Sequence, residues 1–136
     1  MAGSAMAFGA ATPGKPLRAM RRVTVTWTSD DTSGAVSGTS TEEYSGLFWG
    51  ITTDPGATAP TDNYDVCVTD ETGLELLGGT AGSTSTNGNG MNRDTTNTEF
   101  AQANPYPIPI DGPITLTLTA CGNSKVGTIY LWVESR

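Results

Sequence analysis

Carboxylates are the only side chains present in number that could carry out acid–base chemistry. The 136-residue chain has 14 Asp and Glu residues and no histidine. Acidic neighbours occur at Asp30-Asp31, Glu42-Glu43, Asp62/Asp65 and Asp70-Glu71. Two-carboxylate hydrolysis needs one acid whose pKa is raised by an apolar cleft, whereas these acids stand among turn-forming polar residues. We therefore predict solvated turn carboxylates and a protein that is not an enzyme.

The sequence also offers few residues for nucleophilic catalysis or for metal binding. The absence of histidine excludes a Ser–His–Asp triad, a Cys–His pair and a histidine metal site. Cys67 and Cys121 have no basic neighbour that would activate a thiolate, so we predict two buried thiols, although the sequence leaves a disulfide between them open. Calcium is a further open alternative, because 62–65 and 70–72 carry oxygen ligands, but without an EF-hand register. We expect no cofactor and no metal.

Aromatic residues offer binding rather than catalysis. Trp49, Tyr106 and Trp132 could stack on sugar rings, as in a carbohydrate-binding β-sandwich module. The interpretation that we favour places Trp27 and Trp49 in the core. Tyr130 and Trp132 then form a sheet surface that is covered or faces another subunit.

Charge is distributed unevenly along the chain. Of the seven basic residues, four lie in the first 22 positions, where there is no acid, and the remaining three stand against all 14 acids, so the body carries −11. A body of this charge repels a phosphate backbone, and the longest apolar run, 5–11, is too short to span a bilayer. We expect no nucleic-acid partner and no membrane. The basic residues near the start are Lys15, Arg18, Arg21 and Arg22.

The elements that must position these residues are strands. Residues 1–21 are small and irregular, which indicates an extended basic N-terminal arm, and residues 22–136 show apolar–polar alternation with no helical period. The sequence therefore predicts an all-β, antiparallel β-sandwich, jelly-roll-like, preceded by the arm. The predicted strands are 22–28, 35–39, 46–53, 64–69, 74–77, 114–118 and 129–133.

Alternation also predicts which side chains face the core. In 46–53 the pattern turns Leu47, Trp49 and Ile51 inward and Phe48 outward. The stretches 114–118 and 129–133 are predicted to form a hairpin. The predicted core is Val23, Val25, Trp27, Leu47, Trp49, Ile51, Val66, Val68, Leu74, Leu76, Ile114, Leu116, Leu118, Ile129, Leu131 and Val133.

Four stretches carry a family resemblance. They are Val23-Thr-Val-Thr-Trp-Thr-Ser-Asp30, Pro60-Thr-Asp-Asn-Tyr-Asp-Val-Cys-Val-Thr-Asp-Glu-Thr-Gly73, Ile110-Asp-Gly-Pro-Ile-Thr-Leu-Thr-Leu118 and Gly122-Asn-Ser-Lys-Val-Gly-Thr-Ile-Tyr-Leu131. In these the chain resembles small structural proteins of tailed phages and is similar in size to jelly-roll capsid decoration (cement) proteins. The resemblance implies a virion protein made in the bacterial cytoplasm and placed on the phage head surface. It would bind the major capsid protein, clamp adjacent subunits and form a homo-oligomer.

Partner contacts are predicted from charge and aromatic content. Arginines of the arm can form bidentate pairs with carboxylates of a neighbour, and large apolar side chains on one sheet surface can anchor an interface. The alternatives left open are a tail or neck component of the virion and a carbohydrate-binding module. The predicted partner-binding residues are Lys15, Arg18, Arg21, Arg22, Phe48, Tyr130 and Trp132.

Overall fold

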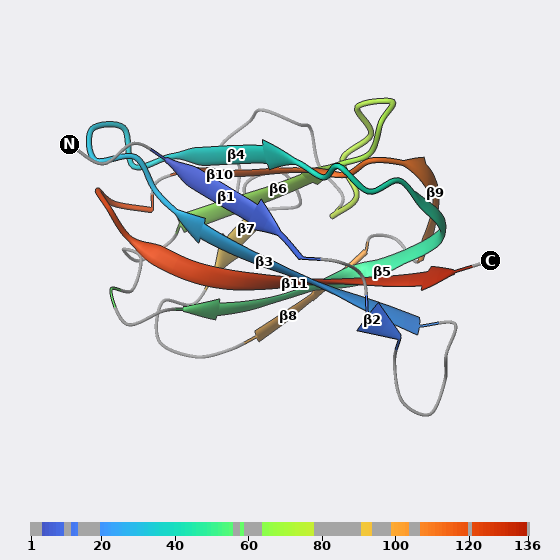
Figure 1. The fold of residues 1–136 in the computed structure, drawn as a ribbon. Coiled ribbons are helices and arrows are strands. Elements are labelled where there is room, and N and C mark those ends of the chain that lie inside the picture. Colours follow the sequence, from blue (N-terminus) through green and yellow to red (C-terminus); the bar gives the residue numbers. More distant parts are fainter. Residues whose placement is uncertain are drawn as a thin grey trace.

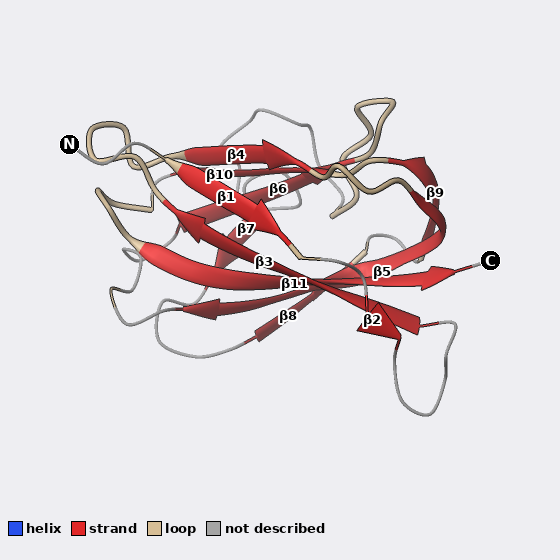
Figure 2. Ribbon diagram, in the orientation of Figure 1, coloured by secondary structure: helices blue, strands red, loops and turns tan. Residues whose placement is uncertain are grey.

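The chain is built from strands. The computed structural model describes residues 4–9, 12–13, 20–55, 58, 64–77, 91–93, 99–103, 107–119 and 121–135, and within these ranges there is no helix (Figure 2). The strands are β1 (Ala5–Phe8), β2 (Thr12–Pro13), β3 (Met20–Thr28), β4 (Val36–Thr39), β5 (Tyr44–Pro55), β6 (Tyr64–Thr69), β7 (Met91–Arg93), β8 (Glu99–Gln102), β9 (Ile108–Gly112), β10 (Thr115–Thr119) and β11 (Val126–Ser135).

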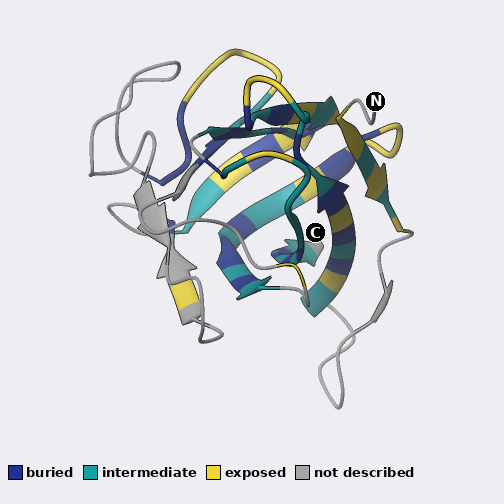
Figure 3. Ribbon diagram, turned by 90° about the vertical axis from the view of Figure 1, so that its left-hand side faces the viewer, coloured by how far each residue is buried: buried dark blue, intermediate teal, exposed yellow. Residues whose placement is uncertain are grey.

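The strands form two antiparallel sheets that face each other (Figure 1). Sheet A has seven strands in the order β1-β3-β11-β5-β8, with β2 also paired to β3 and β9 also paired to β5. Sheet B has four strands in the order β4-β10-β6-β7. Both sheets curl around a shared interior (Figure 3), so the predicted β-sandwich is confirmed, and the architecture is compatible with a jelly-roll-like fold.

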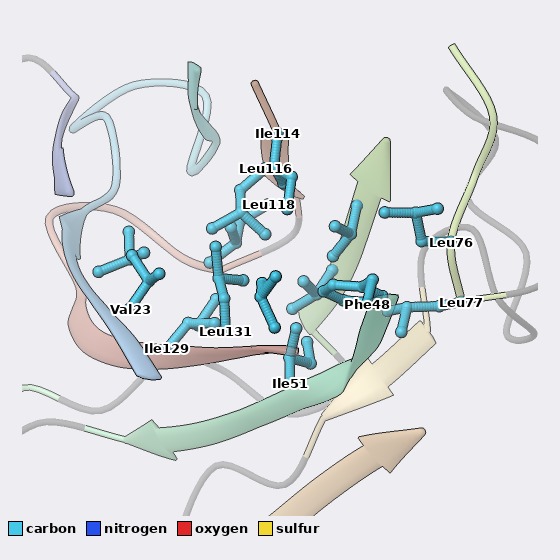
Figure 4. Close-up of a cluster of buried hydrophobic side chains, with 14 of the residues drawn as sticks. Val23, Phe48, Ile51, Leu76, Leu77, Ile114, Leu116, Leu118, Ile129 and Leu131 are labelled. Carbon is cyan, nitrogen blue, oxygen red and sulfur yellow. The ribbon is translucent and has the colours of Figure 1, made fainter. Parts of the chain in front are cut away.

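Alternating apolar residues from both sheets fill the interior. β3 shows the pattern clearly, because Val23 and Val25 are fully buried while Thr26 between two inward residues is exposed. Burial of each such side chain contributes about 1.5–3 kcal/mol. Figure 4 shows the side chains converging between the sheets. The confirmed part of the predicted core is Val23, Val25, Trp27, Ile51, Val66, Val68, Leu76, Ile114, Leu116, Leu118, Ile129, Leu131 and Val133.

A β-bulge in β5 overturns part of the predicted core. Trp132 of β11 faces Gly50, but the next residue, Val133, faces Phe48, so Trp49 is the extra residue. One extra residue inverts the alternation. Phe48, predicted to face outward, is therefore fully buried, whereas Trp49 and Leu47 are only half-buried. The bulged backbone is held at its carbonyl, which accepts the Ala103 N–H at 2.9 Å.

The predicted hairpin of the last two strands is wrong. β10 lies in sheet B and β11 in sheet A, so the turn at 121–125 carries the chain from one sheet to the other. Buried Ser29 holds this corner: its hydroxyl donates to the Gly122 carbonyl at 2.6 Å and accepts the Lys125 N–H at 2.8 Å. The alternation predicted for both strands is correct, but β10 pairs with β4 and β6, whereas β11 pairs with β3 and β5.

The segment after β6 also differs from its prediction. Leu74 is 51 % exposed rather than in the core. Glu75 is 4 % exposed, and Leu76 and Leu77 are both fully buried. The strand predicted over 74–77 is not formed: this segment meets β6 only through the isolated bridge of Glu75 with Thr69 and the bond from the Leu76 N–H to the Val68 carbonyl at 2.7 Å.

The side chains of Cys67 and Cys121 are buried thiols, as predicted, and they form no disulfide. Met91–Arg93 is described as β7, and the rest of the segment 78–98 lies outside the described residues. The proline-rich segment 104–110 is described from residue 107 onward and contributes β9 to sheet A.

The extended N-terminal arm is not confirmed. β1 pairs with β3 from Ala5 opposite Thr28 to Phe8 opposite Val25, and β2 pairs with β3 at Arg21 and Arg22. Where residues 1–21 are described, they therefore belong to sheet A. The reason is that β3 is long, and its edge away from β11 offers unpaired backbone groups that another strand satisfies.

Candidate functional site

A cluster of large side chains lies on the outer face of sheet A. We call it the aromatic patch and define it by Met20, Trp49, Thr52, Phe100 and Trp132, which line an open groove of about 330 Å³. Phe100 is 54 % exposed, and both indoles are half-buried. Exposed apolar patches often mark binding sites, and aromatic residues are enriched at protein interfaces relative to the rest of the protein surface.

Four strands bring the patch together. Phe100 of β8 stands directly opposite Thr52 of β5, and Trp132 of β11 stands opposite Gly50. Because Gly50 has no side chain, the space beside Trp132 is open for a neighbouring ring. The bulge turns Trp49 to this same face, so the patch depends on the irregularity that buries Phe48.

Both indole N–H groups of the patch are already bonded within the protein. Trp132 Nε1–H donates to Thr52 Oγ1 at 2.9 Å, and Trp49 Nε1–H donates to Glu134 Oε1 at 2.9 Å. These bonds fix the ring orientations and leave the apolar ring surfaces to make contacts. The patch is thus preorganised, which lowers the entropy lost when a partner binds.

Charged groups flank the aromatic patch. The Arg22 guanidinium lies 5.4 Å from the centroid of the Tyr130 ring, a cation–π contact beside the patch. Arg22 is exposed and pairs across the sheet with Trp132. Glu134 lies on the other side, opposite Met20. A partner would therefore meet an apolar centre with a cation and a carboxylate at its rim.

The predicted partner-binding residues divide into three groups. Tyr130, Trp132 and Arg22 share the outer face of sheet A, which agrees with a contact surface there, although contact itself stays a prediction. Arg21 points to the opposite side of β3, because it alternates with Arg22. Phe48 belongs to the core, so its assignment to a contact face is wrong. Lys15 and Arg18, like Tyr106 of the sugar-binding alternative, lie outside the described residues.

The acidic turns serve the fold. Asp30 Oδ2 accepts the backbone N–H groups of Ser33 and Thr32 at 2.8 and 2.9 Å, and these bonds lower the pKa of Asp30. Asp70 Oδ1 accepts the Thr72 N–H at 2.9 Å in the same manner. Both carboxylates thus act as turn residues, as predicted.

The described residues include no group of three or more His, Cys, Asp or Glu side chains that could hold a metal ion. Where the chain is described, it also contains no helix long and apolar enough to cross a membrane. None of the five residues that line the groove is a carboxylate.

Reasoning from the sequence missed Met20, Thr52 and Phe100, and it named Trp49 only in the sugar-binding alternative. Trp49 follows the apolar alternation of its strand, and only the adjacent Gly50 hints at a bulge. Phe100 is an isolated aromatic residue in a polar stretch, and this pattern could have indicated that its side chain is exposed. Met20 lies in the segment assigned to the arm, but it is the first residue of β3.

Comparisons with protein-family models, with curated proteins and with solved structures gave no match for this chain.

Proposed function

We propose that this chain is a non-catalytic binding protein that docks on a partner protein through the aromatic patch. The observation that carries the proposal is the groove bounded by Trp49, Phe100 and Trp132 on the broad face of sheet A. Aromatic anchors with satisfied polar atoms are the commonest energetic centres of protein interfaces.

The specific role that we propose is decoration of a tailed-phage capsid. Support comes from the resemblance of the strand and turn segments to small virion proteins, and from the sandwich fold with an aromatic patch on one outer face. In this role the patch would bind the major capsid protein on the outside of the head. Arg22 at its rim would pair with a carboxylate of the shell. Each copy needs only a modest interface, because many copies act together on one shell.

Two measurements test this role. The first is the copy number per virion, by quantitative mass spectrometry of purified particles against the major capsid protein. A number in the hundreds supports head decoration, a small multiple of six moves the protein to the neck or tail, and absence from particles refutes a virion role.

The second measurement is shell binding by matched variants. Trp132→Ala removes a central anchor, and we expect its Kd for shells to rise by about 30-fold or more, since an interface hot spot contributes about 2 kcal/mol or more. Thr26→Ala is the control, because Thr26 is exposed on the same sheet face outside the patch, and its Kd should stay within about twofold of wild type. Equal binding by both variants, with each folded by circular dichroism, would remove the patch from shell docking.

A carbohydrate-binding module is the second candidate. The open groove between two fixed indoles and an exposed phenyl ring would accept a sugar ring by stacking. Titration with neutral oligosaccharides tests it: heat of binding that disappears in Trp49→Ala supports the sugar function. Saturable shell binding without any glycan response supports the capsid role.

A further inference from the structure

The groove of the aromatic patch presents ring surfaces whose indole donors are already used. Three of the five side chains that line it are aromatic, those of Trp49, Phe100 and Trp132. The Trp49 indole N–H donates to Glu134 Oε1, and the Trp132 indole N–H donates to Thr52 Oγ1, each at 2.9 Å. A ligand therefore gains no hydrogen bond from either indole, and it meets the faces and edges of the rings instead.

Aromatic rings attract cations to their faces. The quadrupole of a ring makes its face negative, and the indole of tryptophan is the strongest cation binder among the aromatic side chains. The outer face of sheet A already holds one such contact, because the Arg22 guanidinium lies 5.4 Å from the centroid of the Tyr130 ring. Tyr130 stands opposite Thr52, so this contact lies directly beside the groove. The rings of the groove offer the same attraction to a cation from outside the chain.

The charges around the groove also favour a cation. The register of β3, β5 and β11 places three charged residues on this face, which are Arg22, Asp54 and Glu134. Two of the three are carboxylates, and the whole chain carries a net charge of −7. Arg22 reduces the resulting potential but does not reverse its sign. The chain therefore attracts a cation to this face more strongly than an anion.

A quaternary ammonium group fits the groove better than an ordinary ammonium group. An ammonium group has three N–H donors, and each loses a bond to water among apolar rings. A quaternary ammonium group has no donor, and its methyl groups can pack against the rings and against Met20, which also lines the groove of about 330 Å³. Recognition of quaternary ammonium ligands is an established use of cation–π attraction.

We propose that the groove binds a small quaternary ammonium compound with a single positive charge, of which choline is the test case. Its methylated nitrogen would lie between Trp49, Phe100 and Trp132. An attached phosphate would be repelled by the carboxylates of Asp54 and Glu134, so the ligand assigned here is the free compound and not a phosphorylated headgroup. This inference goes beyond protein docking and does not rest on it, because it requires only the groove.

NMR spectra of the ¹⁵N-labelled chain test the proposal. Choline chloride replaces sodium chloride at constant ionic strength while the indole N–H cross-peaks are followed. We expect those of Trp49 and Trp132 to shift and to saturate, whereas that of buried Trp27 stays in place. The matched ligand is the neutral isostere of choline, in which carbon replaces the charged nitrogen. Its Kd is expected to be about five- to thirtyfold higher, which corresponds to cation–π attraction at exposed to desolvated sites.

A variant of one ring separates cation–π attraction from apolar packing. Phe100 is 54 % exposed, so Phe100→Leu leaves the core intact and keeps an apolar side chain in the groove. We expect its Kd for choline to rise by about two- to fivefold, and its Kd for the neutral isostere to stay within about twofold of wild type. Thr26→Ala is the control, because Thr26 is exposed on the same face outside the groove, and it should bind choline as wild type does.

Three results would refute the proposal. The first is equal affinity for choline and its neutral isostere, and the second is the absence of choline-dependent shifts at Trp49 and Trp132. The third is tighter binding of phosphocholine than of choline, which would overturn the assignment to a free, singly charged ligand. These titrations contain no shells, so a negative result leaves the docking proposal standing, and a failure of shell binding leaves the choline result standing.

Discussion

The buried carboxylate of Glu75 is expected to contribute strongly to stability. Glu75 is 4 % exposed, and its two oxygens accept separate backbone N–H groups. Oε2 accepts from Val68 at 2.8 Å and Oε1 accepts from Leu77 at 2.8 Å. The side chain thus ties β6 to the turn that places Leu76 and Leu77 in the core.

Glu75→Gln and Glu75→Ala remove these bonds in steps. Glutamine keeps one acceptor but turns an NH₂ group toward the other N–H, so one charge-assisted bond, worth about 1.5–3 kcal/mol, is lost. Alanine leaves two buried N–H groups without this acceptor, at about 1–3 kcal/mol each, and opens space beside the leucines. We expect a free energy of unfolding lower by about 2 kcal/mol for glutamine and by about 4 kcal/mol for alanine.

Urea unfolding followed by tryptophan fluorescence measures both values, and calorimetry should show the matching fall in Tm. Glu43→Gln is the control, because Glu43 is exposed, and it should change stability by less than about 0.5 kcal/mol. If Glu75→Gln is as stable as Glu43→Gln, the two backbone bonds are not worth their assigned energy and the reasoning fails.

Three further predictions concern single side chains. Ser29→Ala should lower the free energy of unfolding by about 1–3 kcal/mol in urea titrations, because two bonds at the corner between the sheets are lost, while Ser45→Ala at an exposed site should not. Burial, with a smaller effect of Glu42, raises the pKa of Tyr44 above 10.0. The neutral phenol therefore contributes its full stabilisation below pH 10.0, and this contribution is lost as pH rises through the raised pKa. Tyr44→Phe should flatten the resulting decline of Tm at alkaline pH. Backbone N–H groups of the turn, that of Ser33 first, hold the pKa of Asp30 below 3.8. The contribution of the Asp30 carboxylate to stability is therefore present above pH 3.8 and is lost as pH falls through the lowered pKa. Asp30→Asn should reduce the decline of Tm at acid pH, and an unchanged decline in this variant would contradict the assignment.

Local alternation was sufficient to predict the strands that have no irregularity. β3, β10 and β11 alternate between buried and more exposed residues, and their buried residues belong to the core. This works because each side chain of a regular strand has its face decided by its position alone.

Pairing between distant segments could not be predicted in the same way. The turn after β10 looks like a hairpin turn, but Ser29, more than 90 residues earlier, holds it as a corner between sheets. The burial of Leu77 beside Leu76 depends on Glu75 bonding back to β6. Such information is carried by contacts between elements, which a single sequence does not display.

The candidate site could be predicted only in part, because it also depends on pairing between distant strands. Tyr130 and Trp132 were found because they alternate with the core residues of their strand. The favoured interpretation placed Trp49 in the core because the bulge is defined by pairing with β11 and by the switch of partner strand along β5, from β8 to β9. An extra residue of this kind leaves little trace in the alternation itself.

The bulge in β5 acts like a frameshift in the side-chain pattern of that strand. Removing the extra residue Trp49 would restore regular pairing, with Gly50 opposite Trp132 and Phe48 opposite Val133, so the remaining residues of β5 would keep their faces. Phe48 would stay buried opposite Val133, and the aromatic patch would lose its bulged tryptophan. One inserted residue has therefore added a large aromatic side chain to the outer face of sheet A while the residues on both sides of it keep their regular pairing with β11.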